Sequence, residues 1–321
     1  MEPVTGQFPS AAKWGYRVAV AAGCLTLLMV LFNPVFALLE AAVCFTVARG
    51  IHRGRAWAAI AAAGFWLIPI PVLLLRGMPA SAQVSLAFSG TVGLVMAWAA
   101  AALWRRPAKG GAAWPWAAFL ALFTVGIVCF RPFAQPSVSM APTVLAGDRF
   151  FVETATWTLG RAPARDQIVA IHYPIDRKQV YIKRIAGVPG DRLTIRVGKL
   201  VRNGTPVAEP WAVHASGFED PYRDNFPSAP SFGIKAPAEE MLRTCVRDGE
   251  LVVPAGAYFV LGDNRDDSFD SRYWGLVRRA DIIGSPVLLY GSYARPADGS
   301  QPPSAMPGVR QLRWNRLFRI L

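Results

Sequence analysis

The chain has 321 residues, of which 53% are hydrophobic and only 17% are charged, and 11 are tryptophan. This composition is too apolar for one ordinary soluble domain, and the chain is long enough for a membrane part and a globular part. The net charge of +13 would suit a nucleic-acid-binding protein. However, no basic stretch is interleaved with exposed aromatic residues, so we expect no nucleic-acid partner.

Five apolar runs fill most of the first 130 residues. They are Val18–Phe32, Val35–Ala48, Trp57–Leu75, Gln83–Trp104 and Trp114–Phe130. A membrane-spanning helix needs about 20 consecutive apolar residues. The last three runs are long enough, whereas the first two are short and are separated only by Asn33 and Pro34. The pattern predicts a multi-span α-helical membrane anchor over residues 1–130, with four or five spans.

Basic residues between the apolar runs predict the orientation of this anchor. Those between the second and third runs, and between the fourth and fifth, are Arg49, Arg53, Arg55, Arg105, Arg106 and Lys109. Short loops rich in Lys and Arg face the cytoplasm. The chain after residue 130 is therefore expected on the outer side of the membrane.

From residue 150 the sequence changes to short runs of β-branched and aromatic residues, bounded by glycine, proline and aspartate. These runs are Phe150–Thr154, Gln167–His172, Val180–Ile185, Arg192–Val197 and Tyr258–Leu261. No long amphipathic helices alternate with them, which argues against a doubly wound sheet. We expect residues 131–321 to form a mostly antiparallel β domain of several small sheets.

Two parts of this β-rich region are less well determined. Residues 205–250 are rich in proline, serine and acidic residues and lack periodicity, which indicates an inserted loop region or subdomain. Residues 309–321 place leucine, tryptophan and phenylalanine among arginines. Such a tail suits either a membrane surface or a β-strand that closes the sheet, and both alternatives stay open.

Several common catalytic signatures are missing. The chain has no GxSxG, Walker or HExxH motif, and a Ser-His-Asp triad would need His172 or His214. His172 lies in a strand-like run, where a structural role is the better interpretation. The cysteines and histidines lack metal-ligand spacing, so we expect no metal and no cofactor.

A serine activated by a lysine remains available. Ser139 lies in the proline-rich segment 136–143, which its prolines bias to extended structure. Lysine accepts a proton only when it is neutral, and burial in apolar surroundings lowers its pKa. Lys183, between Val-Tyr-Ile and Arg-Ile-Ala, suits a strand that enters a core. An outward-facing lysine is the more common arrangement for a lone lysine in such a run.

The segment 262–275, GDNRDDSFDSRYWG, is dense in Asp, Asn and Arg. An EF-hand calcium loop requires glycine at its sixth position, and counted from Asp263 that position is Ser268. Asx turns and Asp–Arg pairs predict instead a loop whose polar groups bind one another. Such a loop can hold a catalytic pair rigidly.

Three motifs in one order resemble those of bacterial type I signal peptidases, the membrane-bound Ser-Lys leader peptidases. They are PSVSMAPT with the following GD (136–148), YIKRIAGVPGDRL (181–193) and VPAGAYFVLGDNRDDSFDSRYWG (253–275). The resemblance implies a membrane anchor followed by an antiparallel β catalytic domain. It also implies a multi-pass protein of the bacterial cytoplasmic (inner) membrane, with the catalytic domain on the extracytoplasmic (periplasmic) side.

The resemblance implies roles for individual residues. Ser139 matches the nucleophile and Lys183 the general base. Ser137 matches the hydroxyl that joins the Ser139 backbone N–H in the oxyanion hole. Ser268 matches a serine that orients the lysine. The residues that match the supporting positions are Asp263, Asp270 and Arg272.

The implied activity is the removal of N-terminal signal peptides from exported preproteins by a Ser-Lys dyad. Preproteins and membrane lipid are the expected partners. An extended substrate is expected to add a strand to an edge near residues 133–139 and 180–183. The candidate substrate-binding residues are Phe133, Gln135, Pro136, Tyr181 and Ile182.

Three residues depart from the family pattern. Val138 stands where glycine is common, Asp267 where asparagine is common, and Gln135 where an aliphatic residue is common. Val138 is β-branched, so we expect an ordinary φ there. Two alternative functions are a Ser-Lys peptidase dedicated to one secretion or conjugation system, and a non-catalytic membrane scaffold. The scaffold would be marked by loss of Ser139 or Lys183, and both are present.

Overall fold

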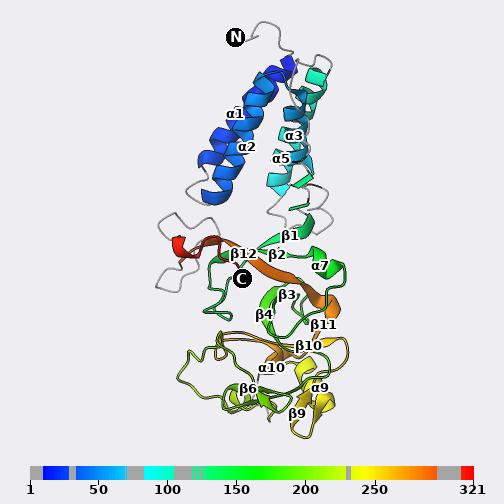
Figure 1. The fold of residues 1–321 in the computed structure, drawn as a ribbon, viewed down its shortest axis with the longest axis vertical. Coiled ribbons are helices and arrows are strands. Elements are labelled where there is room, and N and C mark those ends of the chain that lie inside the picture. Colours follow the sequence, from blue (N-terminus) through cyan, green and yellow to red (C-terminus); the bar gives the residue numbers. More distant parts are fainter. Residues whose placement is uncertain are drawn as a thin grey trace. The chain divides into compact units, whose positions relative to one another are not determined.

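The computed structural model describes residues 10–28, 34–68, 83–104, 130–228, 233–294 and 312–321, with position 70 and scattered positions between 118 and 129. The described chain forms two compact units. The first consists of helices before residue 130, and the second, mostly of strands, begins at Phe130 (Figure 1).

Close helix packing characterises the first unit. Its helices are α1 (Ser10–Leu28), α2 (Pro34–His52), α3 (Ala56–Leu67) and α5 (Gln83–Trp104). Helix α1 packs against α2 and α5, and α3 packs against α5. A Cβ atom at Gly15 would lie only 2.6 Å from the Cβ atom of Ala99. Small residues therefore allow these helices to approach closely.

Within the described residues, no helix combines the length and the apolar character that a membrane crossing requires. The predicted four or five spans are therefore not supported by these helices. A span needs about 20 apolar residues, whereas α3, which covers the first part of the run predicted at 57–75, is only 12 residues long. Much of the run 114–130 lies outside the described residues.

The second unit contains two sheets in which every strand pair is antiparallel, which confirms the predicted antiparallel β domain (Figure 1). The larger sheet has the order β1-β2-β12-β3-β4-β10-β11, and the smaller has the order β7-β6-β5-β9-β8. The strands of the larger sheet are β1 (Phe130–Ala134), β2 (Asp148–Glu153), β3 (Ile168–His172), β4 (Val180–Gly187), β10 (Ala257–Leu261), β11 (Val277–Arg278) and β12 (Ile282–Ser292). Those of the smaller sheet are β5 (Arg192–Arg196), β6 (Lys199–Arg202), β7 (Thr205–Pro206), β8 (Val246–Arg247) and β9 (Glu250–Val252).

Strand β12 joins two strands that are far from it in the sequence. It pairs with β2 on one side and with β3 on the other. The sequence did not predict this strand, because Gly284, Pro286 and Gly291 interrupt its alternation. Its register shifts at several of these positions, as β-bulges do. The result is one seven-stranded sheet in place of several small ones.

The region 205–250 contributes to the second sheet and its core. It contains β7 and β8 together with helices α8 (Pro221–Asp224) and α9 (Ala236–Cys245), and it ends at the first residue of β9. Strand β9 pairs with β5. Tyr222 and Met241 pack in one buried cluster with Leu193 of β5.

The C-terminal residues 312–321 pair along β12. Isolated bridges join Tyr293 to Leu312 and Leu288 to Ile320. Trp314, which begins the short 3₁₀-helix η5 (Trp314–Arg316), is 60% exposed. The tail thus pairs with a strand, as one alternative predicted. It also presents exposed aromatic residues, as the membrane-surface alternative requires.

Candidate active site

Ser139 lies in a tight turn between β1 and β2. The backbone N–H of Ala141 donates to the carbonyl of Val138, and that of Val144 donates to the carbonyl of Met140, both at 2.9 Å. Met140 is fully buried in a core that includes residues of β4, which anchors the turn. Val138 is not among the described non-glycine residues with a positive φ. This confirms its predicted ordinary backbone conformation.

Three side chains at this turn form a chain of polar contacts. Ser137 Oγ lies 3.1 Å from Ser139 Oγ, and Gln135 Nε2 lies 3.1 Å from Ser137 Oγ. Gln135 and Ser139 are buried, whereas Ser137 is exposed. Among the hydrogen bonds of the described chain, none uses the backbone N–H of Ser139. That N–H and the Ser137 hydroxyl are both available at the predicted oxyanion hole.

Lys183 is buried, so the outward-facing alternative is wrong. It lies on β4 between Tyr181 and Ile185, and only 3% of its surface is exposed. Its ammonium nitrogen Nζ lies 2.9 Å from Ser268 Oγ. Burial lowers the pKa of Lys183 to about 8, against the opposing charge of Asp270. A lysine with this pKa is partly neutral near pH 7 and can accept a proton.

The loop 262–275 is held together by a buried ion pair. Arg272 binds Asp270 through two hydrogen bonds of 2.8 Å, and both side chains are almost fully buried. Asp270 also accepts from the backbone N–H of Gly262 at 3.1 Å and from that of Arg272 at 3.3 Å. Burial raises the pKa of Asp270, but the charge and hydrogen bonds of Arg272 outweigh it and hold that pKa below its ordinary value. The carboxylate therefore stays ionised and the loop stays braced.

Gly262 brings this loop against the turn that holds Ser139, the predicted nucleophile; residues 135–144 are called the nucleophile turn below. A Cβ atom at Gly262 would lie 2.4 Å from the carbonyl oxygen of Ser139 and 2.2 Å from Ser268 Oγ, so only glycine fits there. The backbone N–H of Asn264 donates to the same Ser139 carbonyl at 3.1 Å. No hydrogen bond in the described chain joins Lys183 Nζ directly to Ser139 Oγ. Catalytic hydrogen bonds often tighten only when substrate is bound.

Asp263 ties the lysine strand to the nucleophile turn. Arg184, the residue after Lys183, donates to Asp263 Oδ1 and Oδ2 at 2.7 Å each. Thr143 Oγ1 donates to Asp263 Oδ2 at 2.6 Å. The sequence pointed to Asp263 as a supporting residue but missed Arg184 and Thr143. Thr143 lies inside the first motif and Arg184 inside the second, and these positions were the signal that could have identified them.

The loop 262–275 also has stabilising contacts with residues 209–213, which sequence reasoning missed. Arg265 forms a buried ion pair with Glu209, with Nη1 2.8 Å from Oε2. The backbone N–H of Val213 donates to the carbonyl of Asp263, and the N–H of Arg265 donates back to the carbonyl of Val213. The region 205–250 therefore supports the loop from behind.

The five predicted substrate-binding residues divide into two groups. Phe133 and Tyr181 are half-buried and Pro136 is exposed, whereas Gln135 and Ile182 are almost fully buried.

The strand edges near these residues are partly open. Among the described residues, β1 pairs only with β2, so its other edge has no strand beside it. Strand β3 pairs with residues 180–184 of β4, but β10 pairs with β4 only from residue 184 onward. Residues 180–183 thus have a strand on one side only within the described chain.

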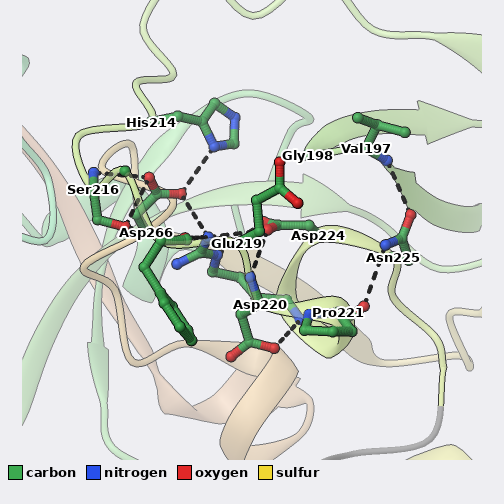
Figure 2. Close-up of a pocket in the computed structure, with 13 residues that line it drawn as sticks. Val197, Gly198, His214, Ser216, Glu219, Asp220, Pro221, Asp224, Asn225 and Asp266 are labelled. Carbon is green, nitrogen blue, oxygen red and sulfur yellow. Dashed lines mark hydrogen bonds and ion pairs between the residues drawn. The ribbon is translucent and has the colours of Figure 1, made fainter.

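A separate pocket lies behind the loop, between residues 197–198, 214–225 and Asp266 (Figure 2). His214, Asp224 and Asp266 offer ligand atoms within 4.8 Å of one another. However, Arg223 binds Asp224 at 2.8 Å and lies 3.4 Å from Asp266. This guanidinium already supplies the positive charge that a metal ion would bring, so the cluster fits a metal poorly.

Comparison with known proteins places these motifs in a family. The family model described as "Signal peptidase, peptidase S26" matches residues 112–290. The chain belongs to this family. It is a type I signal peptidase, a hydrolase of the serine endopeptidase class.

Individual relatives agree with this assignment. The chain is 34% identical over 173 residues to signal peptidase I U of Bacillus subtilis, covering 53% of this chain and 80% of that protein. It is 32% identical over 187 residues to signal peptidase I of Bacillus caldolyticus, covering 58% and 93%. A crystal structure of a signal peptidase I from Enterococcus faecalis V583 is 33% identical and covers 39% of this chain and 97% of that one, with a TM-score of 0.30. That TM-score is too low to support a fold argument, so the assignment follows from the sequence matches.

Proposed function

We propose that this peptidase removes signal peptides from exported preproteins with Ser139 as nucleophile and Lys183 as general base. The observation that best supports this proposal is the burial of Lys183, whose pKa of about 8 leaves part of it neutral at physiological pH. Ser268 holds its amine at 2.9 Å, and Gly262 packs between Ser268 and the Ser139 carbonyl. These contacts supply what a serine nucleophile needs, a neutral base held by an orienting group.

The reaction proceeds in two halves. In the first, Ser139 Oγ attacks the scissile carbonyl carbon while its proton passes to Lys183 Nζ. The charge that develops on the carbonyl oxygen is stabilised by the Ser137 hydroxyl and the Ser139 N–H. Lys183 then protonates the leaving amine, which departs and leaves an acyl ester on Ser139. In the second half, water attacks the ester carbonyl, Lys183 takes its proton, and that proton returns to Ser139 Oγ as the ester breaks.

The substrate binds as an extended strand. Support comes from the open edges of β1 and of residues 180–183 of β4, which lie on either side of the nucleophile turn in the chain. An added strand would gain main-chain hydrogen bonds from these edges. Phe133, Pro136 and Tyr181 are the predicted residues that retain exposed surface for such a contact.

The catalytic unit works at the outer face of the cytoplasmic membrane, where exported preproteins emerge. Support comes from the apolar runs of residues 1–130 and from the basic residues between them. Protease added to spheroplasts, whose outer membrane has been opened, should digest the second unit. Protection of residues 131–321 in spheroplasts would contradict this location.

The test of the mechanism uses the purified full-length chain and a preprotein. Ser139→Ala and Lys183→Ala should each abolish cleavage, because each removes a group that makes or breaks a bond. The control is Lys235→Ala, since Lys235 is an exposed lysine outside the site. Normal cleavage by either active-site variant would refute the dyad, and no cleavage by the wild-type chain would refute the proposed substrate class.

A further inference from the structure

Gln135 occupies a fixed place beside the nucleophile turn. It follows β1 directly, and its backbone N–H donates to the carbonyl of Asp148 at 2.8 Å. Its own carbonyl accepts from the N–H of Gly147, also at 2.8 Å. The residue is only 4% exposed. Its side chain therefore starts from an anchored backbone and has little freedom to leave the site.

The surroundings determine which end of the Gln135 amide faces Ser137. The amide nitrogen Nε2 lies 3.1 Å from the backbone carbonyl oxygen of Ser137 and 3.1 Å from Ser137 Oγ. A carbonyl oxygen can only accept a hydrogen bond. The nitrogen, and not the amide oxygen, must therefore point toward Ser137.

This donor controls the direction of the Ser137 hydroxyl. Within the described chain, Ser137 Oγ contacts only Gln135 Nε2 and Ser139 Oγ. Because the Gln135 nitrogen is a donor, Ser137 must accept from it, so the Ser137 proton points away from Gln135 and is free to donate to Ser139 Oγ or to an oxyanion beside it.

We propose that Gln135 is a positioning residue that orients the Ser137 hydroxyl as a donor at the oxyanion hole. The proposal rests on the proposed function, in which Ser137 stabilises the oxyanion. It assigns Gln135 a role different from the substrate contact that its place in the sequence suggested. A substrate contact would act on binding, whereas an oriented donor acts on the transition state.

The first experiment compares kcat and KM for cleavage of a preprotein by full-length variants. Gln135→Met keeps the length of the side chain but removes the donor. We expect kcat to fall about tenfold with KM within a factor of about two, a smaller loss than the 10²–10³ expected for an oxyanion donor itself. Gln135→Glu, once ionised, would accept the Ser137 proton and turn it away from Ser139. Its kcat should fall further, about a hundredfold.

A matched control and a double-mutant cycle separate orientation from general damage. Gln167→Met removes a similar contact elsewhere in the sheet, between Gln167 Nε2 and Ser285 Oγ at 2.9 Å, and should leave kcat unchanged. In a Ser137→Ala background, Gln135→Met should not lower kcat further, because Gln135 acts only through Ser137.

Three results would overturn the proposal. They are an unchanged kcat for Gln135→Met, a raised KM at constant kcat, and an equal loss with and without Ser137. If Gln135→Met does not fold, the test uses Gln135→Glu instead. Its kcat is then compared in the wild-type and in the Ser137→Ala background. Failure of the wild-type chain to cleave a preprotein would count against the proposed function and not against Gln135 alone.

Discussion

The two sides of the site are held in different ways. The hydroxyls of the nucleophile turn are in neutral contacts between residues close in sequence, such as the 3.1 Å contact between Ser137 and Ser139, and Ser137 is exposed. The loop 262–275 is held by buried charges, both inside the loop, as in Arg272 with Asp270, and to a distant residue, as in Asp263 with Arg184. A nucleophile must be reached by substrate, whereas a lysine base must stay dry and fixed to keep its lowered pKa.

Removal of the Arg272 guanidinium is the strongest test of this difference. Arg272→Met would leave the buried Asp270 carboxylate without its partner, and loss of one member of a buried pair costs about 3–5 kcal/mol. The free energy of unfolding of the second unit, measured in urea, should fall by that amount. Arg243→Met, which breaks an exposed pair with Glu240, should cost about 0–1 kcal/mol. Equal losses would show that the buried charges do not hold the loop.

Gly262→Ala tests the contact between the two sides. The added Cβ would meet the Ser139 carbonyl at 2.4 Å, so the turn and the loop must separate. A displacement of this kind in a catalytic pair lowers kcat about a hundredfold. Gly217→Ala, where a Cβ would meet nothing within 4 Å, is the matched control. Full activity of Gly262→Ala would mean that the close approach is not needed for catalysis.

The dependence of activity on pH tests Lys183, the base that the loop 262–275 contacts through Ser268. Only neutral Lys183 accepts a proton, and its pKa is lowered to about 8 by burial. The reactive fraction therefore grows as pH rises through that value, so kcat/KM should increase about tenfold between about pH 7 and pH 9. Initial rates in buffers of constant ionic strength measure this limb. A flat profile across that range would exclude Lys183 as the titrating base.

Sequence reasoning identified the three segments that the structure brings together, because each motif is local. The predicted strand at 180–185 became β4, and the loop formed at 262–275 as expected. The burial of Lys183 could not be read from its neighbours, because Ser268 and the rest of the loop cover it from far along the chain. The partners of Asp263 and Arg265 were missed for the same reason. Gln135 was placed near substrate by its position, since no local pattern reveals which group its amide meets.

The half-paired edge of β4 has a consequence for the range of substrates. Main-chain N–H and carbonyl groups are the same in every peptide except at proline, which lacks the N–H. A substrate strand bound along residues 180–183, as we propose, would therefore be recognised by its extended shape, largely without regard to its side chains. Many unrelated preproteins satisfy such a rule. A proline whose missing N–H falls opposite this edge would be the change that the enzyme tolerates least.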